Sequence, residues 1–163
     1  MSERLAALRV LVRHGDAAQR TDALAAFRAR YAGQPLVLDA WFAVQAEMPT
    51  AAAPEIVCAL LADAAFTLRN PNRVHALLGT FARQNRTGFH RADGAGYALL
   101  VEQLRALDAL NPQTAARLAT AFNGWSRLEP ARRALAQTSL RELAVSPGLS
   151  ANLADIVQRT LAG

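Results

Sequence analysis

Cysteine is nearly absent from this 163-residue chain, which contains only Cys58. A single cysteine excludes an internal disulfide bond. Cys58 lies in the apolar run EIVCALLA, residues 55–62, and a free cysteine in such surroundings is usually buried. The sequence therefore predicts a core thiol.

Lysine is absent altogether, so all 18 basic side chains are arginines, and the formal net charge is +5. A basic chain raises the hypothesis of nucleic-acid binding. However, the arginines are spread along the chain, and only Arg132 and Arg133 are adjacent. A polyanion-binding surface usually clusters its charge and interleaves aromatic residues. We therefore expect no nucleic-acid partner.

Long hydrophobic runs are also missing. No apolar stretch approaches the roughly 20 residues that a membrane-spanning helix requires. The chain does not open with a basic segment followed by an apolar secretory core. We therefore expect no membrane partner and, from these absent signals, a cytoplasmic location. Hydrophobic residues still make up 52% of the sequence, so the chain is not disordered.

Strand-like alternation of apolar and polar residues is absent, and helical periodicity takes its place. Leu24, Phe27 and Tyr31, for example, share one face of a helix. Asn70-Pro71 and Asn111-Pro112 are each typical of a capped helix start. Further helix starts are predicted at Ser2, Ala17, Pro35, Pro54, Pro130 and Ser150, and helix ends at Gly15, Gly33, Pro49 and, for the fourth helix, Phe66.

These signals predict a single all-α domain over residues 1–163, with about eight or nine helices. Consecutive helices joined by short turns tend to pack antiparallel. A stack of such pairs forms a right-handed superhelix, a solenoid of the HEAT or armadillo type. No clean sequence repeat of about 40 residues is visible, so the repeat is expected to be structural only. A compact helix bundle is the competing architecture.

The stretch FHRADGAGYALL, residues 89–100, contains two glycines that suggest a phosphate-binding loop. A dinucleotide fingerprint needs a third glycine and a preceding strand, and a P-loop needs G-K-[ST]; neither is present. We instead expect Asp93 to cap a helix. Gly94 and Gly96 would then allow another backbone to approach closely.

No metal site is predicted. The three histidines, His14, His75 and His90, are far apart in the sequence, and none lies in an H-E-x-x-H motif. No Ser-His-Asp arrangement can be argued from spacing either. The residues alone therefore show no recognisable catalytic apparatus.

Similarity to a known family is carried by residues 70–118, NPNRVHALLGTFARQNRTGFHRADGAGYALLVEQLRALDALNPQTAARL. This stretch resembles the C-terminal region of bacterial aminopeptidase N, a zinc metallopeptidase of the gluzincin class. LVLDAWFAVQA, residues 36–46, and SERLAAL, near the start of the chain, are similar to the same family. The similarity is collinear over nearly the whole chain.

The resemblance implies that this chain is a fragment without catalytic residues of its own. In the family, the zinc ligands and the general-base glutamate lie in an upstream catalytic domain, which this chain lacks. The helical C-terminal domain closes over that catalytic domain and helps to control which peptides enter. The implied partners are therefore the catalytic domain of the same polypeptide and peptide substrates. The implied cofactor is zinc, bound outside this chain, and the fragment alone should be inactive.

The helix after Asn111 contains the first candidate substrate contacts. Leu118, Phe122 and Trp125 share one face of this helix, and Gln113 and Arg117 lie on the opposite one. A glutamine, a permanent cation and a helix N-terminus together suit the carbonyls and carboxylate of a peptide. The resemblance points to the same pair, with Gln113 at the pocket for the first residue and Arg117 on the leaving-residue side. A solvated helix face is the alternative.

The helix after Asn70 contributes three weaker candidates. Its apolar face is formed by Val74, Leu77, Leu78 and Phe81. Asn72, Arg73 and His75 lie off this face or at its boundary, and we expect them to line the same substrate cavity. Packing or solvent exposure is the alternative for His75, because the family often has an arginine there.

A free-standing helical-repeat scaffold that binds a partner protein in its concave groove is the competing function.

Overall fold

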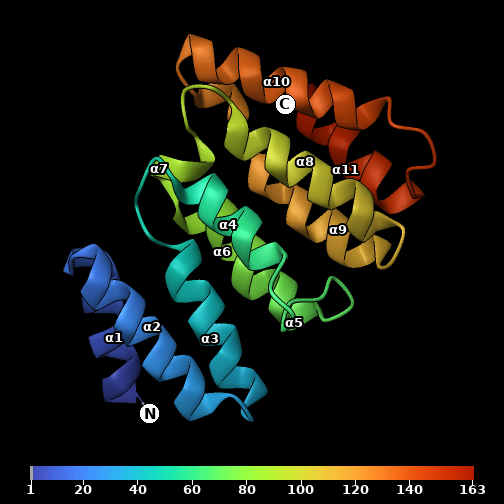
Figure 1. The fold of residues 1–163 in the computed structure, drawn as a ribbon. Coiled ribbons are helices and arrows are strands. Elements are labelled where there is room, and N and C mark those ends of the chain that lie inside the picture. Colours follow the sequence, from blue (N-terminus) through green and yellow to red (C-terminus); the bar gives the residue numbers. More distant parts are fainter. Residues whose placement is uncertain (1) are drawn as a thin grey trace.

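The computed structural model describes residues 2–163, and these form ten helices when residues 71–84 are counted as one. The long helices stack side by side from one terminus to the other (Figure 1). The bounds are α1 (Ser2–His14), α2 (Ala17–Tyr31), α3 (Pro35–Ala46), α4 (Ala53–Leu61), α5 (Pro71–Val74), α6 (Thr80–Gln84), α7 (Arg86–Phe89), α8 (Ala95–Asp108), α9 (Pro112–Ala119), α10 (Pro130–Ala144) and α11 (Ala151–Ala162).

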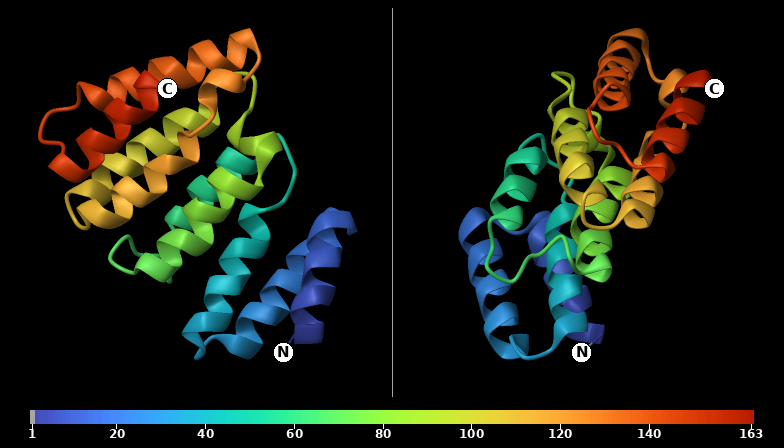
Figure 2. Two further views of the ribbon diagram at one scale, coloured as in Figure 1. Left: turned by 180° about the vertical axis from the view of Figure 1, so that it is seen from behind. Right: turned by 90° about the vertical axis from the view of Figure 1, so that its right-hand side faces the viewer.

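The helices form successive layers, as a solenoid requires. α1 packs on α2 and α3 at one end, and α8, α9, α10 and α11 pack on one another at the other. Helix 71–84 lies between these groups and contacts both α3 and α9. Two further views show that the layers rotate progressively, with the two termini at opposite ends of the stack (Figure 2). The predicted all-helical solenoid is confirmed. No strand occurs, and no helix long and apolar enough to cross a membrane, between residues 2 and 163.

Most predicted helix starts are correct because side chains satisfy the free N–H groups there. Asn70 accepts hydrogen bonds from the amides of Asn72 and Arg73, and Asn111 accepts one from Thr114. Ser150 caps α11 in the same way. Ser2 already lies within α1 and is therefore not its cap.

Two predicted helices end earlier than expected. α4 ends at Leu61, not Phe66, because Asp63 accepts a hydrogen bond from the Ala65 amide at 2.8 Å and forms a turn. The helix after Asn111 ends at Ala119 and continues as a 3₁₀ turn, Thr120–Phe122. Gly124 then adopts a positive φ of 87°, which breaks the helix before Trp125.

The turn before α8 also differs in detail from the prediction. Gly94, with a φ of 77°, occupies the cap position of α8 in place of Asp93. The Asp93 carboxylate lies one residue earlier, where it accepts hydrogen bonds from the Ala95 amide and from Arg91. The expected close approach of another part of the backbone is confirmed at Gly96. A Cβ on Gly96 would lie 2.4 Å from the Phe89 carbonyl oxygen, so no other residue fits.

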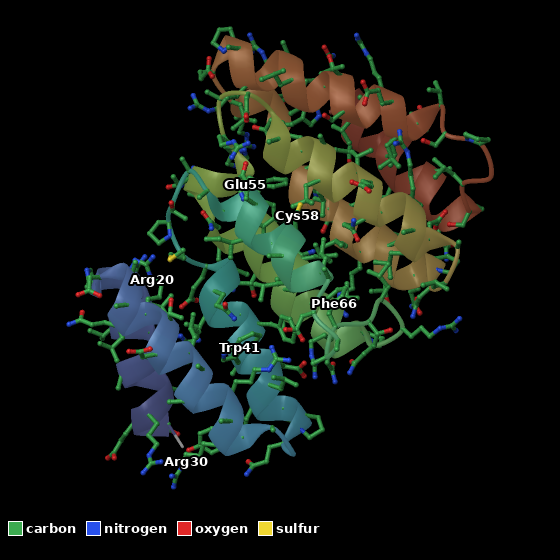
Figure 3. All side chains as sticks on the ribbon, viewed as in Figure 1. Arg20, Arg30, Trp41, Glu55, Cys58 and Phe66 are labelled. Atoms are coloured by element: carbon green, nitrogen blue, oxygen red, sulfur yellow. The ribbon has the colours of Figure 1, made fainter. Side chains whose placement is uncertain are left out.

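The prediction of a buried Cys58 is wrong. Its thiol is exposed on the outer face of α4, near Glu55 (Figure 3). The apolar run is amphipathic: Val57 and Leu60 face the core, and position 58 falls on the other side of the helix.

Asn85 connects three segments inside the core. Its side chain is 1% exposed, and its amide nitrogen donates to the carbonyls of Ala46 at 2.8 Å and Met48 at 2.7 Å. Its amide oxygen accepts from the Gly88 N–H at 2.9 Å. One side chain thus joins the end of α3 to the junction of α6 and α7.

Replacing Asn85 by alanine should lower the free energy of unfolding by about 3 kcal/mol, because buried backbone groups lose their partners. Urea denaturation followed by circular dichroism measures the change. Asn152→Ala, on an exposed position of α11, is the matched control and should shift the free energy by less than about 0.5 kcal/mol. Equal effects of the two substitutions would contradict the structural role of Asn85.

Cys58 should react completely with iodoacetamide in the native chain, because it is exposed. Desolvation raises the pKa of its thiol, with smaller contributions from Glu102 and Glu55. Because the thiolate is the reactive form, the alkylation rate should still be rising above pH about 9. Mass spectrometry of timed reactions measures this profile. A rate that levels off below pH 8 would show that the pKa is not raised.

Candidate functional site

A basic cavity lies at the junction of helix 71–84 and α9. It encloses about 290 Å³. Its walls are formed by Pro71, Asn72, Val74, His75, Arg83, Thr114, Arg117 and Leu118. The structure therefore brings together three predicted residues, Asn72, His75 and Arg117, from segments about 40 positions apart in the chain.

Arg83 is a member of this cavity that the sequence did not single out. Its Nη2 donates hydrogen bonds to the Arg117 carbonyl oxygen at 2.7 Å and to Thr120 Oγ1 at 3.1 Å. Burial lowers the pKa of Arg83, and the nearby charge of Arg117 lowers it further. Arg83 thus links helix 71–84 to the end of α9 and adds a second guanidinium. No sequence signal marked it, because it lies next to Gln84 on an ordinary polar face.

A wide turn in helix 71–84 sets the position of His75 and Arg83. Residues His75–Gly79 form a π-helical turn between α5 and α6, and such turns are frequent at functional sites. Gly79 lies between the two side chains: a Cβ there would lie 3.3 Å from His75 Cδ2 and 3.7 Å from Arg83 Nη1. The missing side chain lets both residues stand next to each other at the cavity.

Two predicted residues do not line the cavity. Arg73 is 5% exposed, and its guanidinium is turned inward, where it binds the Asp39 carboxylate and the Ala65 carbonyl. It also lies 5.0 Å from the centre of the Phe42 ring. The expectation that Arg73 lines the cavity is therefore corrected: its interactions tie α5 to α3. Gln113 is exposed on the first turn of α9, outside the walls of the cavity.

The chemistry of the cavity is that of binding. It offers guanidinium, amide and imidazole groups, and none of the described residues that line it is acidic. Guanidinium groups pair well with carboxylates and with carbonyl oxygens. Within residues 2–163, no three His, Cys, Asp or Glu side chains gather where they could hold a metal ion. The arrangement can therefore hold an anionic or carbonyl-rich ligand from one side.

The solenoid and its sequence define an ARM-repeat helical domain. Residues 1–162 match the family described as domain of unknown function (DUF3458_C) ARM repeats, and the chain belongs to this family.

The relatives that this chain matches are named as aminopeptidases. The chain is 42% identical over 142 residues to aminopeptidase N of Caulobacter vibrioides, covering 87% of this chain and 16% of that protein. It is 36% identical over 165 residues to aminopeptidase N of Escherichia coli, covering 90% and 19%. The solved structure of Legionella pneumophila aminopeptidase A in complex with aspartic acid superposes with a TM-score of 0.93 at 30% identity, covering 99% of this chain and 19% of that one.

These comparisons confirm the resemblance to the C-terminal region of aminopeptidase N. The chain spans 16–19% of the length of these relatives.

Replacing Arg83 by glutamine should loosen the end of α9, because the guanidinium holds the Arg117 carbonyl and Thr120. Losing hydrogen bonds worth about 1 kcal/mol should speed local amide exchange over residues 119–123 about fivefold. Hydrogen–deuterium exchange measures this. Arg86→Gln is the control, since the Arg86 side chain has no hydrogen-bond partner among residues 2–163. Unchanged exchange in the Arg83 variant would show that the link does not stabilise the end of α9.

Proposed function

We propose that this chain acts as the C-terminal domain of a zinc-dependent aminopeptidase that releases N-terminal residues from peptides. In this proposal, the solenoid closes over the active site of a catalytic domain in the same polypeptide and shapes substrate access. The proposal is supported by relatives named aminopeptidase N over most of this chain. The observation that carries it is the basic cavity, which places Asn72, His75, Arg83 and Arg117 at one surface.

The cavity suits the far side of a peptide substrate. Arg117 is proposed to hold a carbonyl or the carboxylate on the leaving-residue side, and Arg83 keeps the Arg117 backbone in place. Asn72 and His75 are proposed to supply neighbouring polar contacts. Gln113 is proposed to reach the substrate from the exposed first turn of α9, at the pocket for the first residue. The buried Arg73 is proposed to support the wall of this cavity by tying α5 to α3.

Catalysis itself is assigned to the part of the polypeptide outside this chain. The resemblance implies zinc and a general-base glutamate, whose role would be to activate water at the scissile carbonyl. The described residues do not fit a zinc site, because no group of three metal-binding side chains occurs among them. This chain's proposed share is to bind, to orient and to exclude bulky folded chains. A cytoplasmic location is part of the proposal.

In the full-length enzyme, Arg117→Ala should lower kcat/KM for short peptides about tenfold or more. The reason is that a charged hydrogen bond contributes about 1.5 to 3 kcal/mol to binding. Steady-state kinetics with peptides of two to six residues would show this, together with the zinc content of each preparation. Arg141→Ala is the matched control, because Arg141 is exposed on α10 and its side chain makes no hydrogen bond or ion pair with residues 2–163. Unchanged kinetics at every peptide length would remove Arg117 from the site.

The rival function is a free-standing scaffold for a partner protein. The gene sequence upstream of this chain distinguishes the two functions. A reading frame that continues upstream and encodes H-E-x-x-H with a further glutamate supports the peptidase. A stop codon just before Met1 supports the scaffold.

A further inference from the structure

A second cavity lies beyond α9 and shares no lining residue with the first. It encloses about 240 Å³ between α7, the start of α8, the turns after α9 and α10. The residues that matter here are Arg86, His90, Tyr97, Phe122, Trp125 and Arg127. Neither the proposed peptidase function nor the sequence motifs account for this cavity.

The floor of the cavity is a rigid aromatic cluster. Phe89 packs edge-on against Tyr97 and Phe122, with ring centroids 5.3 and 5.6 Å apart. All three rings are almost fully buried. Trp125 is fixed as well, because its indole N–H donates to the Thr160 carbonyl at 2.7 Å. The floor of the cavity is therefore preformed and rigid, with little of each ring exposed.

His90 presents an N–H donor at this cavity. Its Nδ1 lies 2.8 Å from the Tyr97 hydroxyl, which has no other hydrogen-bond partner among residues 2–163. Burial raises the pKa of Tyr97 to about 12, so the phenol keeps its hydrogen and needs an acceptor. Nδ1 is that acceptor. Burial also lowers the pKa of His90, with Arg86 and Arg132 adding to the effect, so the neutral ring carries its hydrogen on Nε2.

The Nε2 of His90 is available to a ligand. It has no hydrogen-bond partner among the described residues, and every fully buried side-chain nitrogen or oxygen there has one. Nε2 is therefore reached by solvent. The ring packs edge-on against Phe89, with centroids 5.0 Å apart, and the backbone of His90 is held by Arg132, whose Nε donates to the His90 carbonyl at 2.6 Å.

Positive charge surrounds the opening. Arg86 and Arg127 are exposed, and the side chains of both are free of hydrogen bonds and ion pairs within residues 2–163. None of the described residues that line the cavity is acidic. The nearby Glu129 is already engaged by Arg132, at 3.0 Å, and by two backbone amides at the start of α10. Two guanidinium groups thus lack an internal counter-charge.

We propose that this cavity is a binding site for a small organic carboxylate with a flat apolar body, such as an aromatic carboxylate. The guanidinium groups of Arg86 and Arg127 pair with the carboxylate, and Nε2–H of His90 donates a hydrogen bond to it. The apolar body packs against the accessible part of Trp125 and the half-buried Leu128. A free amino acid fits less well, because its ammonium group finds no carboxylate in the walls.

The test is a titration of the 163-residue chain with benzoate, followed by NMR. The indole N–H of Trp125 and the ring of His90 should shift with a single Kd in about the millimolar range. Trp41, which lies in the N-terminal layers, is the internal reference and should not move. Arg86→Ala and Arg127→Ala should each weaken binding at least fivefold. Both residues are exposed and unpaired, so these variants should fold, which circular dichroism checks.

Three controls distinguish carboxylate binding in this cavity from binding elsewhere or by another anion. Benzamide, the uncharged analogue, should produce no shift at equal concentration. Arg117→Ala should leave benzoate binding unchanged. If benzoate binding were weakened by Arg117→Ala and by neither of the other two variants, benzoate would bind in the first cavity. That outcome would overturn this proposal and leave the proposed peptidase function unaffected. Inorganic phosphate that binds as tightly, with the same variant sensitivity, would overturn the assignment to organic carboxylates. Absence of any shift at Trp125 would overturn the site itself.

Discussion

The structure depends on helix 71–84 being fastened at both ends by buried polar groups. At its start, Arg73 binds Asp39 on α3. Just past its end, Asn85 binds the carbonyl of the last residue of α3, a second carbonyl shortly after it, and an amide in α7. Leaving any of these buried groups without a partner costs more than the bond itself contributes, so neither end can slide. The π-helical turn between the two anchors is therefore held in register, and it sets where His75 and Arg83 stand.

The second half of the chain is organised by close backbone contact and by the break after α9. Gly96 lets α8 lie against the Phe89 carbonyl, which brings Tyr97 and Phe89 into one aromatic cluster. The change from α-helix to 3₁₀ turn at Ala119 then divides the surface. In this segment, Thr114, Arg117 and Leu118 before the break line the first cavity, and residues 121–125 after it line the second. Both cavities are basic because, within residues 2–163, their arginines are not used in ion pairs, unlike those that bind Asp39, Glu55 and Asp63.

The positions of helices could be predicted where a local interaction decides them. Asn70, Asn111 and Ser150 satisfy N–H groups within three residues, so their signals are independent of the rest of the fold. The predictions from sequence were wrong where residues distant in the chain, or residues on neighbouring helices, decide where a helix ends or which of its faces is buried. α4 ends early at a turn formed by Asp63, which is also held by Arg28 of α2. Cys58 is exposed because the packing of α4 turns Val57 and Leu60, and not position 58, toward the core.

For the site, local signals in the chain were enough to predict the helix that carries Gln113 and Arg117, the capped helix that carries Asn72 and His75, and the likeness to aminopeptidase N. These follow from local capping, periodicity and residue identity. The packing of the helices was needed to show that Arg83 joins these residues and that the Arg73 side chain turns inward. Both outcomes rest on partners more than 30 positions away, Arg117 and Asp39, and a contact of that range is set by how the helices stack.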